Sequence, residues 1–436
     1  MKNRMINFFK TKIHRNKEGA EEEEREAQES REEPAEEEEP VKVHPVKRML
    51  NLGEDAESLW EKIRQHRRVL RNRWVILGIV LLLVLLSGGL YLHFHVARSY
   101  SVLSSEKRND INGTRYERFG KNLLKYSSDG VSCLTDGGGT LWSSTFSIQS
   151  PLLDICQNTA AIAEKDGTQV FIYNQEGQVG EFQTLLPIEK IRVAKQGVVA
   201  VILEDTESTW INFYDSEGEL IAENRTSLEE SGYPLDIALS PDGRKMMVSF
   251  LKTAGESVET DVTFYNFDSI GKASVNNLVN TVAYENLAVP EVFFVSDKTS
   301  VAFRGDGFSV YKGREVPEET ANVTFEEEIL SVFYDEKHIG FVFQSDDKEH
   351  KYLLRVYNMN GRRTTQKYFD FDYKEIRMDE GKILMIQEGA MAVFSSSGRL
   401  RAQVKYDKPI EYVLALDGFG KYMILTQEST DKIRLK

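Results

Sequence analysis

Cysteine and histidine are scarce in this chain of 436 residues, and their scarcity limits the chemistry available to it. Two cysteines, Cys133 and Cys156, are too few for a disulfide scaffold or a cysteine-rich metal site. Beyond residue 100 the histidines are His338 and His350, each beside turn residues, so a catalytic triad or multi-histidine metal site lacks candidates. We therefore predict no catalytic residue, cofactor or metal site. We expect two buried thiols, although a pairing between them stays open.

Two other patterns could in principle bind an ion, but neither has the required context. Asp370 and Asp372 lie two residues apart on one predicted strand, so their side chains share one face, and they lack the spacing of a calcium loop. Gly137–Gly139 could approach a phosphate, yet no helix follows to supply a dipole, so we predict a hairpin turn.

Positive charge is also in short supply, with 55 Lys and Arg against 69 Asp and Glu and a net charge of −14. Residues 1–73 hold equal numbers of acidic and basic side chains, and residues 74–93 hold neither. The whole net negative charge therefore belongs to the remainder of the chain. This balance argues against a nucleic-acid-binding domain.

A long uncharged run occupies residues 74–92. As a helix it would reach about 28 Å, enough for a hydrocarbon core of roughly 30 Å. Trp74 and Tyr91 stand near its two ends, where aromatic rings favour the membrane interface. The run predicts a single transmembrane helix anchored by these two side chains, because a buried core helix is seldom apolar all round over this length.

The residues that flank this run predict its orientation. Basic side chains crowd the segment before it, at Lys62, Arg64, Arg67, Arg68, Arg71 and Arg73. The segment after it offers Arg98 and Lys107. Positive charge favours the cytoplasmic side, so we expect a single-pass protein of the cell membrane with its N-terminus in the cytoplasm and the rest extracellular.

The cytoplasmic part divides into three segments by composition. Residues 1–17 form a basic stretch in which Met5, Phe8, Phe9 and Ile13 gather on one side of a helix. Binding to the inner leaflet, docking of a partner and a frayed end without a role all remain open. Residues 18–49 are an acidic linker that we expect to be disordered. Residues 50–73 predict a juxtamembrane helix, whose Arg68, Arg71 and Arg73 would contact inner-leaflet lipid.

A sequence motif recurs through the C-terminal part: a predicted strand that ends in an aromatic residue, followed by a turn and a glycine. Six copies place the aromatic residue at Tyr173, Tyr214, Tyr265, Tyr311, Tyr357 and Phe394, and a looser seventh copy has it at Tyr126. Repeats of about 40 to 50 residues built from strands are the signature of β-propeller blades. We therefore predict an all-β propeller over residues 116–436, preceded by a stalk at residues 93–115.

The number of blades depends on how the ring closes. The last unit, which begins near Ile410, lacks its outermost strand. The strand at residues 139–144 could supply it, because a closed ring leaves no open edge. This arrangement predicts seven blades, with eight left open because residues 116–134 could add further strands.

The repeated motifs of the predicted blades resemble those of known propeller families. Leu239-Ser-Pro-Asp-Gly243 and the aromatic–turn–glycine endings are similar to bacterial propellers of the tryptophan–aspartate-repeat type, and Gly139-Thr-Leu-Trp142 resembles a quinoprotein blade ending. With the predicted anchor, residues 70–436 resemble an uncharacterised family of membrane-anchored propellers from Gram-positive bacteria. The resemblance implies a fold and no assigned activity. The chain departs from working quinoproteins, because it lacks an adjacent cysteine pair and most blades lack the tryptophan.

Two functions remain for such a protein. The first is a non-enzymatic binding or scaffolding module that presents an extracytoplasmic propeller to a protein or a cell-envelope polymer. It follows from the propeller, the anchor and the scarcity of catalytic side chains. The alternative is an extracytoplasmic enzyme, either a quinone-cofactor dehydrogenase or a hydrolase that uses carboxylates at the ring centre. We expect the first, with the lipid bilayer as a second partner.

Overall fold

The computed structural model describes residues 52–436, apart from residues 109, 112, 206–207, 228–230 and 256. The predicted basic segment 1–17 and the acidic linker 18–49 lie outside the described residues. The chain divides into two units, Met1–Gly89 and Leu90–Lys436.

One continuous helix, α2 (Leu52–Phe94), covers both the predicted juxtamembrane segment and the predicted span. Proline is absent from this stretch, so no residue removes a backbone donor and interrupts the helix. Within the described part of the chain, one segment, Trp60–Tyr91, is long and apolar enough to cross a membrane. This finding rests on length and composition, and it is compatible with a single-pass anchor.

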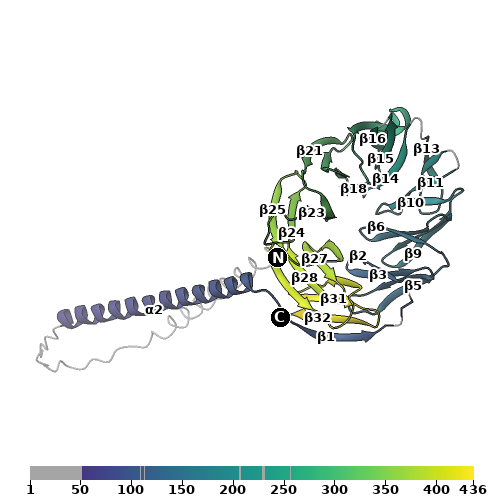
Figure 1. Ribbon diagram of the computed structural model, residues 1–436. Coiled ribbons are helices and arrows are strands. Elements are labelled where there is room, and N and C mark those ends of the chain that lie inside the picture. Colours follow the sequence, from purple (N-terminus) through teal and green to yellow (C-terminus); the bar gives the residue numbers. More distant parts are fainter. Residues whose placement is uncertain (1–51, 109, 112, 206–207, 228–230, 256) are drawn as a thin grey trace, which may run out of the picture. The chain divides into compact units, whose positions relative to one another are not determined.

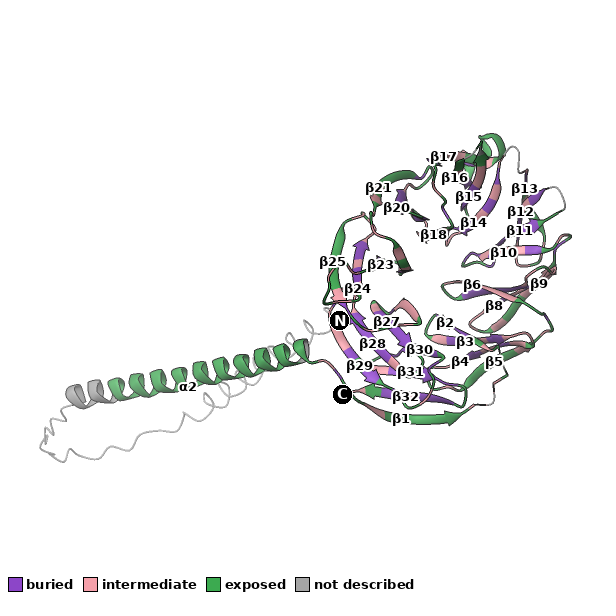
Figure 2. Ribbon diagram, viewed as in Figure 1, coloured by how far each residue is buried: buried purple, intermediate pink, exposed green. Residues whose placement is uncertain are grey.

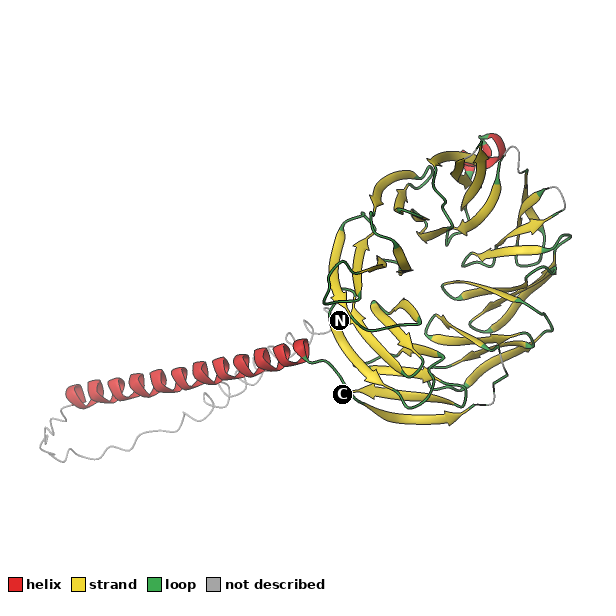
Figure 3. Ribbon diagram, in the orientation of Figure 1, coloured by secondary structure: helices red, strands yellow, loops and turns green. Residues whose placement is uncertain are grey.

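In the unit Leu90–Lys436 the strands of the described residues form eight four-stranded antiparallel sheets, which are the blades of a β-propeller (Figures 1 and 3). Of the two blade numbers that the sequence left open, eight is therefore correct. Seven blades follow the chain from the innermost strand outward, and the eighth combines strands from both ends of the unit.

Blades 1 to 4 contain the following strands: β2 (Arg115–Phe119), β3 (Asn122–Ser127), β4 (Gly130–Leu134) and β5 (Thr140–Thr145); β6 (Pro151–Cys156), β7 (Thr159–Glu164), β8 (Gln169–Asn174) and β9 (Gly177–Gln183); β10 (Ile188–Val193), β11 (Val199–Glu204), β12 (Thr209–Tyr214) and β13 (Leu220–Thr226); β14 (Tyr233–Leu239), β15 (Lys245–Ala254), β16 (Ser257–Asn266) and β17 (Leu278–Glu285). In blade 4 the short helices α3 (Ser269–Lys272) and η1 (Val275–Asn277) connect the last two strands.

Blades 5 to 8 contain the following strands: β18 (Glu291–Ser296), β19 (Thr299–Arg304), β20 (Gly307–Lys312) and β21 (Glu318–Thr324); β22 (Ile329–Tyr334), β23 (His338–Gln344), β24 (Tyr352–Asn358) and β25 (Arg363–Phe369); β26 (Glu375–Asp379), β27 (Lys382–Gln387), β28 (Ala390–Ser395) and β29 (Leu400–Lys405); β30 (Tyr412–Ala415), β31 (Lys421–Leu425), β32 (Ser429–Leu435) and β1 (Tyr100–Lys107).

The second strand of a blade is buried on both of its faces, because neighbouring blades cover it from either side. Strand β11 reads Val-Ala-Val-Ile-Leu through its buried residues, an unbroken apolar run instead of an alternating one. The outermost strands face solvent on one side and alternate, as Figure 2 shows for β5 and β13. The core therefore lies between the blades.

The aromatic residue of each repeat lies at the end of a third strand and contacts the preceding blade. Tyr173 stacks on Trp142 of β5, with ring centroids 5.3 Å apart, and Tyr214 stacks on Phe182 of β9 at 4.7 Å. In each of blades 1 to 7 the outermost strand has a β-bulge opposite this position of the third strand. The third-strand residues that face the bulges are Leu134, Tyr173, Tyr214, Tyr265, Tyr311, Tyr357 and Phe394. The bulge increases the local twist of the strand beside the turn.

The prediction that Tyr126 is the aromatic residue of a seventh copy of the motif is wrong. Tyr126 lies on β3, the second strand of blade 1, and the position that matches Tyr173 is held by Leu134. Leu134 carries no ring, and therefore the aromatic pattern could not identify this blade.

The predicted closure is also wrong. The strand at residues 139–144 corresponds to β5 and is the outermost strand of blade 1. The eighth blade is completed by β1, which pairs with β32 in antiparallel register from Tyr100 opposite Leu435 to Lys107 opposite Ser429. Part of the segment predicted as a stalk is thus a propeller strand. Its polar sequence Tyr-Ser-Val-Leu-Ser-Ser-Glu-Lys has too few apolar residues to reveal it.

Candidate functional site at the propeller axis

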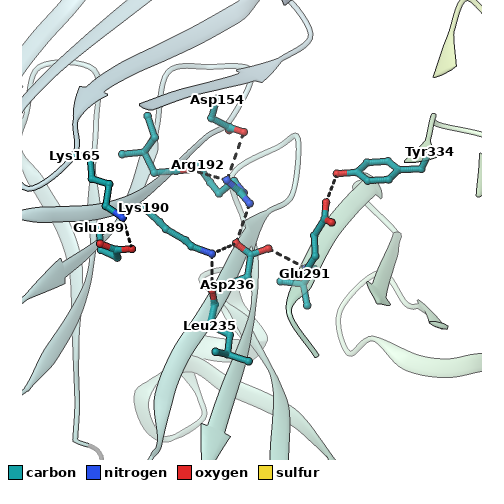
Figure 4. Close-up of polar contacts among 11 residues, drawn as sticks. Asp154, Lys165, Glu189, Lys190, Arg192, Leu235, Asp236, Glu291 and Tyr334 are labelled. Atoms are coloured by element: carbon teal, nitrogen blue, oxygen red, sulfur yellow. Dashed lines mark hydrogen bonds and ion pairs between the residues drawn. The ribbon is translucent and has the colours of Figure 1, made fainter. Parts of the chain in front are cut away.

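Charged side chains from the innermost strands of four successive blades, and a tyrosine from the fifth, meet at the propeller axis (Figure 4). We call this group the axial cluster, and it consists of Asp154 on β6, Lys190 and Arg192 on β10, Asp236 on β14, Glu291 on β18 and Tyr334 on β22. The ring architecture brings these residues together although they span 180 positions of the sequence.

Arg192 is the centre of the axial cluster. Its Nη2 donates to Asp236 Oδ1 at 2.9 Å, and its Nη1 lies 4.0 Å from Asp154 Oδ1. Lys190 Nζ reaches the same Asp236 oxygen at 3.3 Å. Two cations therefore share one carboxylate that is almost completely buried, and a second carboxylate lies on the other side of the guanidinium (Figure 4).

The same carboxylates also tie neighbouring blades through the backbone. Asp154 accepts the Val193 amide at 2.6 Å, and Asp236 accepts the Val292 amide at 2.9 Å. In each pair the carboxylate belongs to one innermost strand and the amide to the innermost strand of the next blade. These bonds give the acidic side chains a structural role in holding adjacent blades in register.

Burial shapes the electrostatics of the axial cluster. It raises the pKa of Asp154, an effect that the Arg192 charge opposes. For Arg192, burial lowers the pKa but Asp236 and Asp154 raise it more, so the guanidinium stays charged. Burial and the adjacent Glu291 carboxylate raise the pKa of Tyr334, whose hydroxyl donates to Glu291 at 2.9 Å. Tyr334 is therefore a neutral donor at physiological pH.

A cavity of about 310 Å³ opens beside the axial cluster. Asp154, Arg192 and Tyr334 supply its polar lining, and Cys156 and Phe293 are among its less polar walls. A volume at the lower limit of ligand pockets accommodates a single side chain or a small polar molecule. The arrangement can bind such a group through the Asp154 carboxylate and the edge of the guanidinium.

A second charged group lies on blades 7, 8 and 1. Arg118 donates to Asp379, which in turn accepts the Ala415 amide. The Arg377 guanidinium lies 3.6 Å from the centroid of the Tyr412 ring, a cation–π contact. Asp379 repeats the pattern of Asp154 and Asp236, a carboxylate that ties one blade to the next.

The residues predicted to contact the membrane belong to α2 and to the segment before it. Trp74 and Tyr91 are exposed on α2, and Arg68, Arg71 and Arg73 are exposed further toward its start. Met5, Phe8, Phe9 and Ile13 lie outside the described residues. The assignment of these residues to lipid contact stays a prediction.

The weak sequence candidates are explained by local contacts. His350 Nδ1 lies 2.9 Å from Asp370 Oδ2, and Lys351 Nζ lies 2.7 Å from Asp372 Oδ2, so each carboxylate has a basic side chain as its neighbour. His338 begins β23 and contacts Asp335 of the preceding turn. In the described ranges no group of three or more His, Cys, Asp or Glu side chains is placed to hold a metal ion.

Both cysteines are free, Cys133 buried and Cys156 half-buried. Burial raises the pKa of each thiol to about 11, which leaves them almost entirely protonated at neutral pH. The expected burial therefore holds for Cys133 and only in part for Cys156, and the pairing that the sequence left open is not formed in the structure.

Sequence reasoning missed the axial cluster. The available signal was a charged residue inside an otherwise apolar first strand, as in Ile188-Glu-Lys-Ile-Arg-Val193 and Leu235-Asp-Ile-Ala-Leu239. Such residues are costly to bury unless a partner is present. The partner could not be found without the blade order, because it belongs to a neighbouring repeat.

The model of a family of unknown function (DUF5711) matches residues 93–435 of the chain. The chain belongs to this family. The match covers β1 as well as the rest of the propeller. A search of curated proteins finds no match.

Solved structures resemble the chain at the level of the propeller fold. BamB from Moraxella catarrhalis is 10% identical with a TM-score of 0.47, covering 77% of this chain and 100% of BamB. A eukaryotic initiation factor is 14% identical with a TM-score of 0.48, covering 78% of this chain and 88% of the other. The Neurospora crassa Pan2 WD40 domain is 13% identical with a TM-score of 0.37, covering 66% and 88%.

Proposed function

We propose that the protein is a membrane-tethered binding protein of the cell membrane. In this proposal α2 crosses the bilayer with the N-terminus in the cytoplasm, and the extracytoplasmic propeller binds a positively charged protein or envelope polymer. The observation that carries the proposal is the difference between the two faces of the propeller.

The two faces follow from the strand order. Because strands alternate in direction, the turns after the first and third strands of every blade lie on one face. The chain leaving α2 joins this face: the Ala97 amide donates to the Arg401 carbonyl at 2.9 Å and the Arg98 amide to the Lys436 carbonyl at 3.0 Å. We call it the anchor-side face. The opposite face, made of the remaining turns and the connections between blades, is called the connector face.

The connector face is strongly acidic over blades 5 to 7. Acidic residues outnumber basic ones in its loops there: Glu326, Glu327, Glu328, Asp346, Asp347, Glu349, Asp370 and Asp372 against Lys348, Lys351 and Lys374. Some of these carboxylates are neutralised, as Glu327 is by Arg355. In the part of the chain that the structure describes, Glu326, Glu328 and Glu349 are exposed and make no ion pair. Such a surface attracts cationic partners over distances of about 10 Å at ordinary salt.

The axial cluster supports binding in preference to catalysis. Asp154 and Asp236 accept backbone amides from the next blade and also face Arg192. A general acid or base needs a carboxyl group that is available to the substrate. Since these carboxylates hold blades together, we infer that the axis is mainly structural and that partners bind at the connector face.

Charge reversal tests this proposal in the full-length protein in its native membrane. Glu326→Lys, Glu328→Lys and Glu349→Lys are combined in one variant. The matched control combines Glu176→Lys, Glu217→Lys and Glu336→Lys, which are exposed residues in turns of the anchor-side face. Proteins crosslinked to the parent are compared with those crosslinked to each variant, with extraction at low and high salt.

We expect the first variant to lose the partner and the control to keep it, and high salt to weaken the parental complex. A partner retained equally by both variants would overturn the role of the connector face. The two variants carry the same charge change, so a difference between them reports the face and excludes an effect of net charge.

A further inference from the structure

The segment that joins the propeller to α2 is short and firmly attached. Besides the bonds of Ala97 and Arg98, the Gln403 amide donates to the Ala97 carbonyl at 3.0 Å. Only His95 and Val96 separate Ala97 from Phe94, the last residue of α2. Three Cα steps span at most about 11 Å. If α2 spans a bilayer, the bilayer surface at the end of α2 is therefore close to the anchor-side face near blades 7 and 8.

That part of the anchor-side face exposes an aromatic ring. Phe419 stands between Gly418 and Gly420 in the turn from β30 to β31, and it is 80% exposed. Both glycines have positive φ, of 103° and 67°, so the turn adopts a conformation that presents the ring outward. Lys382, Arg401 and Lys436 line the same hollow as Phe419, and its acidic residue, Glu380, is paired with Arg118 at 3.4 Å. An aromatic ring among basic side chains suits a bilayer interface, where the ring enters the acyl region and the cations stay at the headgroups.

Exposed apolar side chains recur on the same face across the ring. Val275, in the connection from β16 to β17 of blade 4, is 83% exposed, and Val316, in the turn from β20 to β21 of blade 5, is 37% exposed. Blades 4 and 5 lie on the other side of the ring from blade 8 (Figure 1). Apolar contacts at both sides would hold the face flat against a surface.

Apolar residues at the perimeter lie at the same end of the blades. Leu141, Val179 and Ile221 are exposed at the bulges of the outermost strands of blades 1 to 3, directly after the turns of the anchor-side face. The turns of this face carry both signs of charge, with Arg244 paired to Asp268 at 3.1 Å, for example. The acidic loops of blades 5 to 7 lie on the opposite face, directed away.

We propose that the anchor-side face rests on the bilayer surface, with Phe419 inserted among the lipids and the connector face directed away from the membrane. This inference rests on the proposed function, because it requires that α2 spans the bilayer. It adds a second lipid contact, made by the propeller itself, which restricts its rotation and presents the acidic loops to partners.

The test uses the full-length protein in phosphatidylcholine vesicles, with or without brominated acyl chains that quench tryptophan emission. Phe419→Trp places an indole at the proposed contact. Leu185→Trp is the matched control, because Leu185 is 96% exposed in the connection from β9 to β10, on the connector face. The parental emission from four tryptophans is subtracted in each case. Both sites are exposed turns, and thermal melting checks that each variant folds like the parent.

We expect brominated lipid to remove more than half of the emission added by Phe419→Trp and to leave that added by Leu185→Trp unchanged. Acrylamide in the aqueous phase should quench the two in the opposite order. Equal quenching of both by acrylamide, with no effect of brominated lipid, would overturn the inference.

Extraction with alkaline carbonate distinguishes a failure of the proposed membrane span from a failure of the proposed contact between the propeller and the bilayer. Loss of the protein from the vesicles would contradict the proposed function, because α2 would not be a membrane span. Retention of the protein with an unquenched Phe419→Trp would contradict only the contact between the propeller and the bilayer.

Discussion

Asp236 and Arg192 form an ion pair at 2.9 Å between the innermost strands of blades 3 and 4, and the other Asp236 oxygen accepts the Val292 amide of blade 5 at 2.9 Å. One nearly inaccessible carboxylate thus connects three successive blades. A charge that is buried in this way is stable only while its partners remain. The pair consequently offers a direct measure of how strongly the axial cluster stabilises the ring.

Asp236→Ala is expected to destabilise the propeller by about 3 kcal/mol, the lower end of the range for breaking a buried pair. The lower end applies because Arg192 keeps Asp154 as a second partner and is partly open to solvent. Asp236→Asn, which keeps an oxygen for the Val292 amide, should cost less. Urea unfolding followed by circular dichroism measures both variants.

Asp136→Ala serves as the control for this experiment. Asp136 is an exposed residue paired with Lys432 at 3.5 Å, and its loss should cost no more than about 1 kcal/mol. If Asp236→Ala were as stable as Asp136→Ala, the axial cluster would have no structural role.

The repeated sequence motif predicted the fold because its residues have the same structural role in each blade that carries it. The aromatic residue at Tyr173 or Tyr214 packs on the previous blade, and the glycine after it permits the turn into a bulged outer strand. Such local requirements leave a local signature in the sequence. Blade 1 was missed for the same reason, since Leu134 replaces the ring there.

Closure and the axial cluster could not be predicted because they depend on contacts between distant residues. Strand β1 has a polar sequence, and only its pairing with β32, more than 300 residues away, makes it part of a blade. Arg192 likewise resembles any surface arginine until Asp154 and Asp236 are brought beside it. A sequence pattern can show that one residue of such a contact is unusual, but it does not show which distant residue is its partner.

The closing strand is held by a carboxylate whose pKa is lowered. Asp431 on β32 accepts hydrogen bonds from Ser105 of β1 and from Tyr406, and it faces Lys408 at 3.4 Å. Burial by itself would raise the Asp431 pKa, but these hydrogen bonds and the lysine outweigh burial and lower it. A lowered folded-state pKa means that Asp431 stabilises the fold fully above its unfolded pKa of about 3.9. This stabilisation is lost as the pH falls through the folded-state pKa.

Asp431→Asn should therefore be less stable than the parent above about pH 5, with the difference shrinking below about pH 4. Thermal unfolding at a series of pH values measures the two curves. Asp136→Asn, on an exposed turn, should follow the parent at every pH. A constant gap between Asp431→Asn and the parent would show that the ring closure does not depend on the charge of Asp431.

The orientation of the chain can be tested by cysteine labelling in intact cells, because the native thiols are protonated and largely buried. Glu349→Cys places a thiol on the exposed connector face. Ser30→Cys places one in the acidic linker. A membrane-impermeant maleimide should label the first in intact cells and the second only after permeabilisation, since the basic flank favours the cytoplasm. The reverse order would place the propeller in the cytoplasm.

A peptide of the basic segment 1–17 tests whether this segment binds lipid, as the inner-leaflet hypothesis predicts. Met5, Phe8, Phe9 and Ile13 would each gain roughly 1 to 3 kcal/mol at full burial, and less at an interface. Each Lys or Arg near an anionic surface adds about 1 kcal/mol. A peptide of residues 1–17 should bind vesicles containing phosphatidylserine, gain helicity on binding, and lose affinity at high salt.

Phe8→Glu combined with Phe9→Glu in this peptide should abolish binding, because it removes two apolar groups and adds two negative charges. The control, Asn3→Gln, keeps both charge and apolar surface and should bind like the parent. Circular dichroism and vesicle sedimentation report helicity and affinity. A parental peptide that stays unbound at low salt would contradict the predicted inner-leaflet contact of Met5, Phe8, Phe9 and Ile13.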